Sequence, residues 1–171
     1  RIIKRQGGIA VEPFYNRVMD FALEFHVGKH GVTYNGISVF ATSSTGAYTG
    51  NYVSDEPCLK RRIPEALQGY LSGVCKNLQR HLQNVYSQGY SGPLGVDMMV
   101  VEYQGEKYIH PCVEVNLRQT MGNVCVYLRS QLRRGAAIYR LRPVEETTES
   151  TLVLTPCAKR IEAVLQTEEA E

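Results

Sequence analysis

Several features that would place a chain in a specialised class are missing from this sequence. None of its apolar runs approaches the roughly 20 residues needed to cross a bilayer, and it does not open on a signal peptide. Its net charge is only +2, a basic excess too small to indicate nucleic acid as a partner. It also contains no internal repeat and no low-complexity tract. What remains is an ordinary globular chain, with neither a membrane nor nucleic acid among its expected partners.

The cysteines lack the spacing of a zinc site or a redox pair. The sequence has five of them and no CxxC pair, and only His110 and Cys112 approach metal-ligand spacing. An odd, scattered set is typical of a reducing compartment, so we expect a cytoplasmic protein. A convincing Ser-His-Asp or Cys-His set is also absent, which argues against a nucleophilic side chain as the catalyst.

The composition and length are those of a chain that buries one sizeable core. Hydrophobic residues make up 43% and charged residues 21% of its 171 positions. The chain begins with Arg1 and runs almost directly into an apolar segment. We therefore expect it to be a fragment of a longer protein.

The first third of the chain is predicted to be mostly strand. A short apolar run at residues 9–11 stops at Glu12 and Pro13, as a strand ended by a proline would. Residues 20–27 and 32–43 alternate with a period of two and are typical of a hairpin. The residues expected to share its buried face are Phe21, Leu23 and Phe25. Residues 44–58 are small and polar and are predicted to form a loop.

Two helices are predicted from apolar spacing and end signals. The first begins at Pro64 and runs to about residue 88. Its predicted buried stripe consists of Leu67, Leu71, Val74, Leu78, Leu82 and Val85. The second helix spans about residues 121–134, with Thr120 as its cap and Gly135 as its stop.

The remaining strands complete an α+β chain with a largely antiparallel sheet. Residues 94–103 and 107–116 form a second hairpin, and strands recur at residues 136–141 and 151–155. Residues 159–166 could be strand or helix.

A candidate metal site lies on the second hairpin, in the stretch HPCVEVNLRQTMG. Strand side chains alternate, so Glu114 and Asn116 point to one face, together with Cys112. Asp97 lies on the neighbouring strand, and its carboxylate could converge with those two side chains. Two carboxylates and an amide oxygen form an all-oxygen site that suits Mg²⁺.

Groups that bind anions follow directly. Arg118 could contact phosphate or carboxylate oxygens, and a helix capped by Thr120 would present free N–H groups beside it. An alternating polar strand face in contact with solvent would give the same pattern for Glu114 and Asn116 alone. The addition of Asp97, Arg118 and a helix start favours a site.

The same residues resemble the metal-binding end of the ATP-grasp superfamily. In that family an acidic residue on one strand and an E-x-N on the next, often followed by arginine, hold magnesium bridging the phosphates of ATP. The resemblance implies an ATP-grasp-like fold in which Asp97, Glu114 and Asn116 are metal ligands. It implies that Arg118 is the catalytic residue that contacts phosphate or substrate.

A second segment, AVEPFYNRVMDFALEF, resembles the adenine-binding hinge of the same family. The resemblance implies that Asp20 binds the ribose, and it places at the adenine the residues Glu12, Pro13, Phe14 and Tyr15. The chain would then be the C-terminal portion of the fold, with about residues 1–45 from the small ATP-binding subdomain and about residues 46–171 from the metal-binding subdomain. The upstream lysine and glycine-rich phosphate loop of the family are missing, which is a departure from its pattern.

The implied activity of the intact protein is that of an ATP- and Mg²⁺-dependent ligase. Such an enzyme joins a small carboxylate to an amine or a thiol through an acylphosphate, and the fragment alone is expected to be inactive. Two alternatives remain open from the residues: a catalytically dead binding module with the same fold, and an unrelated α+β metal-binding protein that uses the same acids.

Overall fold

The computed structural model describes residues 4–5, 7–9, 11–86, 89–130, 137–143, 151–154 and 161–167. Eight strands form one sheet in the order β5-β4-β1-β2-β3-β6-β8-β7, and each neighbouring pair is antiparallel. The strands are β1 Asn16–Gly28, β2 Gly31–Thr42, β3 Tyr48–Val53, β4 Gly92–Tyr103, β5 Glu106–Asn116, β6 Ala137–Pro143, β7 Thr151–Leu154 and β8 Ile161–Thr167. The helices are α2 Glu56–Arg61, α3 Glu65–Gln68, α4 Leu71–Tyr86 and α5 Met121–Arg129. The predicted α+β class with a largely antiparallel sheet is confirmed.

Two hairpins form the centre of the sheet, as the alternation predicts. In β1 the three predicted core residues are at most 2% exposed; they are Phe21, Leu23 and Phe25. The second hairpin turns at Gln104 and Gly105, which both have positive φ angles of 53° and 80°. Two successive left-handed residues match the twist of the flanking strands and so close a tight hairpin.

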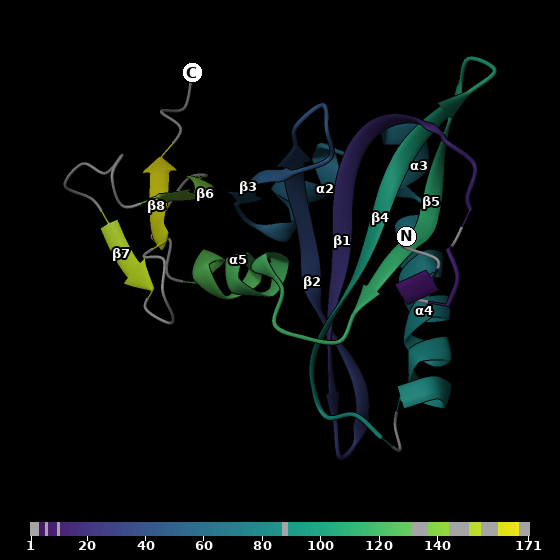
Figure 1. The fold of residues 1–171 in the computed structure, drawn as a ribbon, viewed down its shortest axis with the longest axis horizontal. Coiled ribbons are helices and arrows are strands. Elements are labelled where there is room, and N and C mark those ends of the chain that lie inside the picture. The colour runs from purple at the N-terminus through teal and green to yellow at the C-terminus, as the bar shows by residue number, and fades with distance from the viewer. Residues whose placement is uncertain are drawn as a thin grey trace.

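The two larger helices lie on opposite faces of the sheet. Buried residues of α4 join Phe21, Leu23 and Phe25 in the main core. The intervening residue Glu24 points the other way and bonds to the first turn of α5. Figure 1 shows α4 on the right, beyond the end of β5, whereas α5 lies to the left, beside β2. Because successive strand residues face opposite sides, β1 contributes apolar side chains to one helix and polar side chains to the other.

The segment at residues 44–58, predicted to be a loop, contains regular structure. Strand β3 pairs with β2, and α2 begins directly after Asp55. The Asp55 carboxylate accepts a hydrogen bond of 2.7 Å from the Cys58 N–H and so caps this helix. The sequence Asp-Glu-Pro is a normal helix start, so a local signal for α2 was present. Strand β3 had a weaker signal because Gly50 interrupts its apolar pattern.

The predicted long helix is divided into α3 and α4 by a turn at Gly69 and Tyr70. Pro64 caps the first piece, as its fixed φ angle allows. Val85 does not belong to the buried stripe, because its side chain is 67% exposed at the end of α4. The predicted stop of α5 at Gly135 lies outside the described residues.

The strand predicted at residues 9–11 is wrong. Residues 7–9 and 11–15 form no strand, and Val11 is 85% exposed. Both edges of β1 are already paired, with β2 and β4, so the segment has no free edge there. Residues 161–167, left open between helix and strand, form β8.

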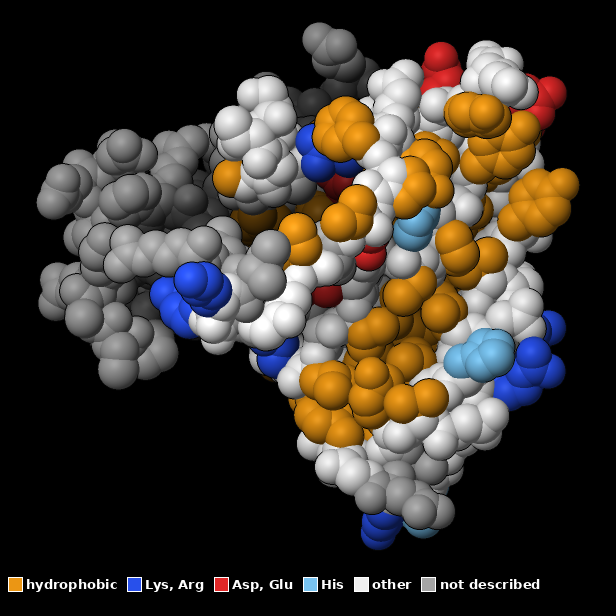
Figure 2. Space-filling model, turned by 45° about the vertical axis from the view of Figure 1, so that its right-hand side comes forward, with side chains coloured by type: hydrophobic (Ala, Val, Ile, Leu, Met, Phe, Trp, Pro, Cys, Tyr) orange, Lys and Arg blue, Asp and Glu red, His pale blue; other side chains and the backbone are white. Residues whose placement is uncertain are grey.

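Exposed hydrophobic side chains gather where β5 forms the edge of the sheet. Figure 2 shows such side chains over the right-hand strands of Figure 1. The exposed large hydrophobic residues of β4 and β5 are Tyr103, Tyr108 and Val113. None of the described helices has the length and apolar character needed to cross a membrane.

The contrast within α4 gives a test of the fold. Leu82 is 5% exposed, so Leu82→Ala should lower the free energy of unfolding by about 2 to 5 kcal/mol through lost burial and a cavity. Val85→Ala, one turn further on, should change it by less than about 0.5 kcal/mol, because its side chain already contacts water. Urea denaturation of the two purified variants measures the difference. Equal losses would contradict the position of α4.

Candidate functional site

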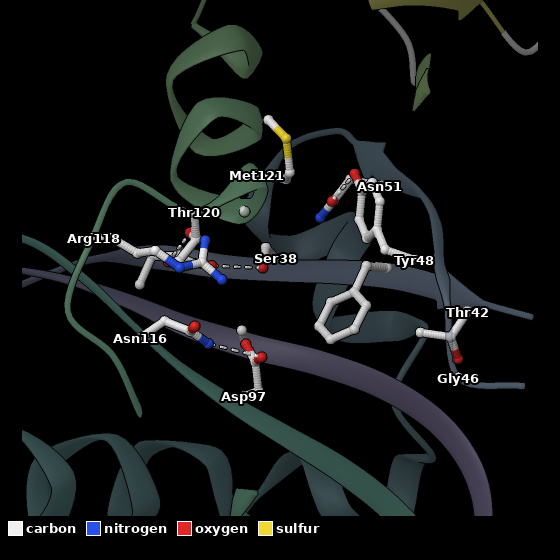
Figure 3. A pocket seen from close by; sticks show the side chains of 14 residues that line it. Ser38, Thr42, Gly46, Tyr48, Asn51, Asp97, Asn116, Arg118, Thr120 and Met121 are labelled. Carbon is white, nitrogen blue, oxygen red and sulfur yellow. Dashed lines mark hydrogen bonds between the residues drawn. The ribbon is translucent and has the colours of Figure 1, made fainter. Parts of the chain in front are cut away.

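A cavity of about 310 Å³ lies on the face of the sheet that carries α5 (Figure 3). Its walls come from all five strands β1 to β5, from the loop before α5 and from the first turn of α5. Of the residues predicted to bind metal or substrate, Asp97, Asn116 and Arg118 line this cavity.

The predicted metal ligands are neighbours across β4 and β5. The register places Asp97 opposite Glu114 and Gly95 opposite Asn116. The Asn116 side chain donates a hydrogen bond of 3.1 Å from Nδ2 to Oδ2 of Asp97 (Figure 3). The three side chains thus lie on one face of the hairpin, as the alternation of the strands requires.

The electrostatics of this group favour a cation. Burial raises the pKa of Asp97 to about 6, and the negative charge of Glu114 adds to that rise. The Asn116 hydrogen bond and the positive charge of Arg118 act in the opposite direction on this pKa. A divalent cation would remove the repulsion between the two carboxylates, so the residues fit a magnesium site. Among the described residues, no three His, Cys, Asp or Glu side chains group closely enough to hold a metal, so the Asn116 amide oxygen would have to serve as the third ligand.

The β5 strand is irregular just before the metal-ligand pair. Its register with β4 shifts between Asp97 and Met99. Glu114 lies opposite Asp97 and His110 lies opposite Met99, so a step of four residues on β5 faces a step of two on β4. A local bulge of this kind turns side chains away from the pleat. Val113, beside the bulge, is 43% exposed. Cys112 is exposed as well, and both burial of its thiol and the charge of Asp97 raise its pKa.

Arg118 follows in the loop between β5 and α5. Its side chain is exposed and lies at the cavity, where its charge lowers the pKa of Asp97. The next element begins with Thr120, whose hydroxyl accepts a hydrogen bond of 2.9 Å from the Asn123 N–H. The predicted cap of α5 is therefore confirmed.

The structure adds Glu24, which the sequence interpretation missed. Its side chain is 1% exposed at the cavity floor. Three side chains donate hydrogen bonds to its carboxylate: Ser38 Oγ at 2.9 Å, Thr120 Oγ1 at 2.8 Å and Asn123 Nδ2 at 2.7 Å. Burial raises its pKa to about 7, although the bonds from Thr120 and Ser38 favour the charged form. A charged residue in the apolar run DFALEF was the available signal.

Two glycines make room for this carboxylate. A Cβ at Gly95 would lie 2.8 Å from Glu24 Oε2, and a Cβ at Gly122 would overlap Oε1. Gly122 is in the first turn of α5, so the helix can approach the sheet only because that residue has no side chain.

The residue predicted to bind ribose lies close to this site. Asp20 is on β1, and its charge contributes to the raised pKa of Asp97. Its carboxylate accepts a hydrogen bond of 2.6 Å from Thr42 and forms an ion pair of 3.3 Å with Arg17. It lines an adjacent cavity of about 410 Å³, which shares Phe40 and Thr42 with the first.

The predicted adenine segment is not brought to the cavity of Asp97. Glu12, Pro13 and Phe14 are exposed, and none of them lines either cavity. Tyr15 is half-buried and packs edge-on against His110, with ring centroids 5.4 Å apart. The segment therefore lies beside β5 and contacts it through one aromatic pair.

The raised pKa values predict how stability depends on pH. Glu24 ordinarily titrates near 4.5 but near 7 in the folded chain, so the native state binds a proton that the unfolded state releases between these values. Stability should therefore fall as pH rises from about 4.5 to about 7, by on the order of 3 kcal/mol for this group. Glu24→Gln should flatten this slope, and Asp97→Asn should remove a part between about pH 4 and pH 6. Urea denaturation at a series of pH values measures both slopes, and an unchanged slope in Glu24→Gln would refute the assignment.

The chain matches solved structures. No protein-family model matches it, and no match to a curated protein sequence was found. A protein assigned to the ATP-grasp superfamily from Archaeoglobus fulgidus matches with a TM-score of 0.52 at 16% identity, over 89% of this chain and 47% of its own. The biotin carboxylase domain of a single-chain bacterial carboxylase matches with a TM-score of 0.52 at 12% identity, over 92% of this chain and 45% of its own.

A third match is N5-carboxyaminoimidazole synthetase from Staphylococcus aureus, with a TM-score of 0.50 at 9% identity over 92% of this chain and 48% of its own. Identities this low show a common fold and nothing finer. The chain spans less than half the length of each of these three proteins. The resemblance drawn from the two sequence segments is thus confirmed at the level of the fold: the chain has the ATP-grasp fold over that length.

Proposed function

We propose that the intact protein is an ATP- and Mg²⁺-dependent ligase that joins a small carboxylate to an amine or a thiol. The observation that carries this proposal is the pairing of Asp97 with Glu114, with Asn116 hydrogen-bonded to Asp97 at 3.1 Å. These side chains come from two adjacent strands of a chain with the ATP-grasp fold.

The proposed reaction has two steps. An oxygen of the substrate carboxylate attacks the γ-phosphorus of ATP, and ADP leaves to give an acylphosphate. The amine or thiol then attacks the acyl carbon, and inorganic phosphate departs while the nucleophile loses its proton. Bound Mg²⁺ would neutralise the phosphate charge.

The residues of this chain have distinct parts in that proposal. Asp97 and Glu114 hold the cation through carboxylate oxygens, and Asn116 does so through its amide oxygen. For this the Asn116 amide must turn, because its nitrogen donates a hydrogen bond to Asp97. Arg118 contacts phosphate or substrate oxygens with its guanidinium at the mouth of the cavity.

The proposed nucleotide contacts come from β1 and from the segment that precedes it. Asp20 is near enough to Asp97 to affect its pKa, which suits a ribose contact beside the phosphates. Glu12, Pro13, Phe14 and Tyr15 are proposed for the adenine. Their exposure fits a surface that nucleotide would cover.

The test uses the full-length protein with Mg²⁺ and ATP, assayed for ADP formation against a panel of small carboxylates. Asp97→Asn and Glu114→Gln should each lower kcat/KM by about 100-fold or more, because loss of a ligand weakens stabilisation of the transferring phosphate. The apparent KM for Mg²⁺ should rise in both variants.

A matched control lies on the same strand as Asp97. Glu102 is an exposed carboxylate of β4 outside both cavities, so Glu102→Gln should leave the kinetics near those of the unaltered protein. ATP binding without carboxylate-dependent ADP formation would indicate a binding module instead of a ligase. Activity retained in Asp97→Asn would overturn the metal assignment.

A further inference from the structure

The buried network around Glu24 connects two parts of the chain that the proposed metal site needs. Ser38 belongs to β2 and Glu24 to β1, whereas Thr120 and Asn123 belong to the first turn of α5. Side-chain hydrogen bonds from Thr120 and Asn123 converge on one oxygen, Oε2 of Glu24. The carboxylate therefore acts as the attachment point of α5 on the sheet.

This attachment also fixes the distance between the first turn of α5 and the sheet. Gly122 leaves space for Oε1 of Glu24, and Gly95 on β4 leaves space for Oε2. The carboxylate is thus packed directly against the backbone of the helix turn and of the strand. Three side-chain donors meet at this one carboxyl group, so their hydrogen bonds form a single network.

The chain leads directly from this attachment to the ligands. Thr120 is two residues beyond Arg118 and four beyond Asn116, the donor of the hydrogen bond to Asp97. A shift of the first turn of α5 would be transmitted through this short loop to both side chains. Figure 3 shows Thr120, Arg118 and Asn116 following one another around the cavity.

We propose that Glu24 is a positioning residue, which anchors the N-terminal turn of α5 to the sheet and thereby sets Asn116 and Arg118 over Asp97. Glu24 does not itself contact substrate, since it is 1% exposed. The inference deepens the proposed function and depends on it for its consequence, although the anchoring can be measured independently.

The other end of α5 supplies a matched control. Arg129, in its last turn, lies 3.6 Å from the Glu56 carboxylate on α2, and it donates a hydrogen bond of 3.2 Å to the Asn35 carbonyl. Glu56 also accepts a bond of 3.1 Å from Tyr34. Glu56→Gln therefore disturbs a partly buried carboxylate and the same helix, at a point far from the cavity.

The first experiment measures Mn²⁺ affinity of the purified chain from the electron paramagnetic resonance signal of free Mn²⁺. Glu24→Gln and Thr120→Val should each weaken binding by about tenfold, as loss of a residue that orients metal ligands does. The double variant should bind Mn²⁺ no more weakly than either single variant, because both changes remove the same hydrogen bond between Thr120 and Glu24. Glu56→Gln should stay within about twofold of the unaltered chain. The proposal is overturned if Glu24→Gln binds normally, if the two losses multiply, or if Glu56→Gln loses as much.

A second measurement separates this inference from the proposed function. Amide hydrogen exchange at residues 121–124 should be at least about tenfold faster in Glu24→Gln, with the amides of α4 unchanged. If the unaltered chain binds no Mn²⁺, the metal proposal fails, and this exchange result alone decides the anchoring. Unchanged amide exchange at the first turn of α5 would refute the anchoring role of Glu24.

Discussion

The placement of α5 depends on the Glu24 carboxylate, which is buried between β1 and the first turn of that helix. An isolated carboxylate at this depth would be costly, and an apolar residue there would remove the acceptor of three side-chain hydrogen bonds. The hydrogen bonds from Ser38, Thr120 and Asn123 resolve this conflict together. The two glycines at positions 95 and 122 are then required by space, so six residues from four elements specify one arrangement.

The chemistry of the cavity follows from that arrangement and from the edge hairpin beside it. Asp97, Glu114 and Asp20 bring negative charge to one region, and their mutual repulsion contributes to the raised pKa of Asp97. Arg118 offsets the charge of Asp97 from an exposed loop position, and Arg17 pairs with Asp20. A divalent ion would remove the remaining repulsion between Asp97 and Glu114.

The comparisons place this site on a known fold without assigning a reaction. The three solved proteins match this fold at 9 to 16% identity, and the chain spans less than half of each. An unrelated α+β architecture is therefore excluded, whereas the choice between a ligase and a binding module rests on the residues. The ligase is proposed from the oxygen-bearing side chains of Asp97, Glu114 and Asn116 and from Arg118, because function is argued from a site and not from a fold.

The sequence by itself determined the features that depend on neighbouring residues. Alternation predicted both central hairpins, and a hairpin brings its two strands side by side, so the proximity of Asp97 to Glu114 and Asn116 could be inferred. Thr120 as a helix cap was likewise a local signal. The break between α3 and α4 and the strand β3 were missed, because the apolar pattern alone does not register a turn or a glycine-interrupted edge.

Only the tertiary structure decided which polar groups meet across the chain. Glu24 bonds to Thr120 and Asn123, which are 96 and 99 positions away, and no periodicity links residues at such separations. It also left the predicted strand before β1 unpaired, since β2 and β4 occupy both edges of that strand. The local sequence pattern determines whether a segment can form a strand or a helix. The partners of a buried polar group are determined by which surfaces pack together, and that is a property of the whole fold.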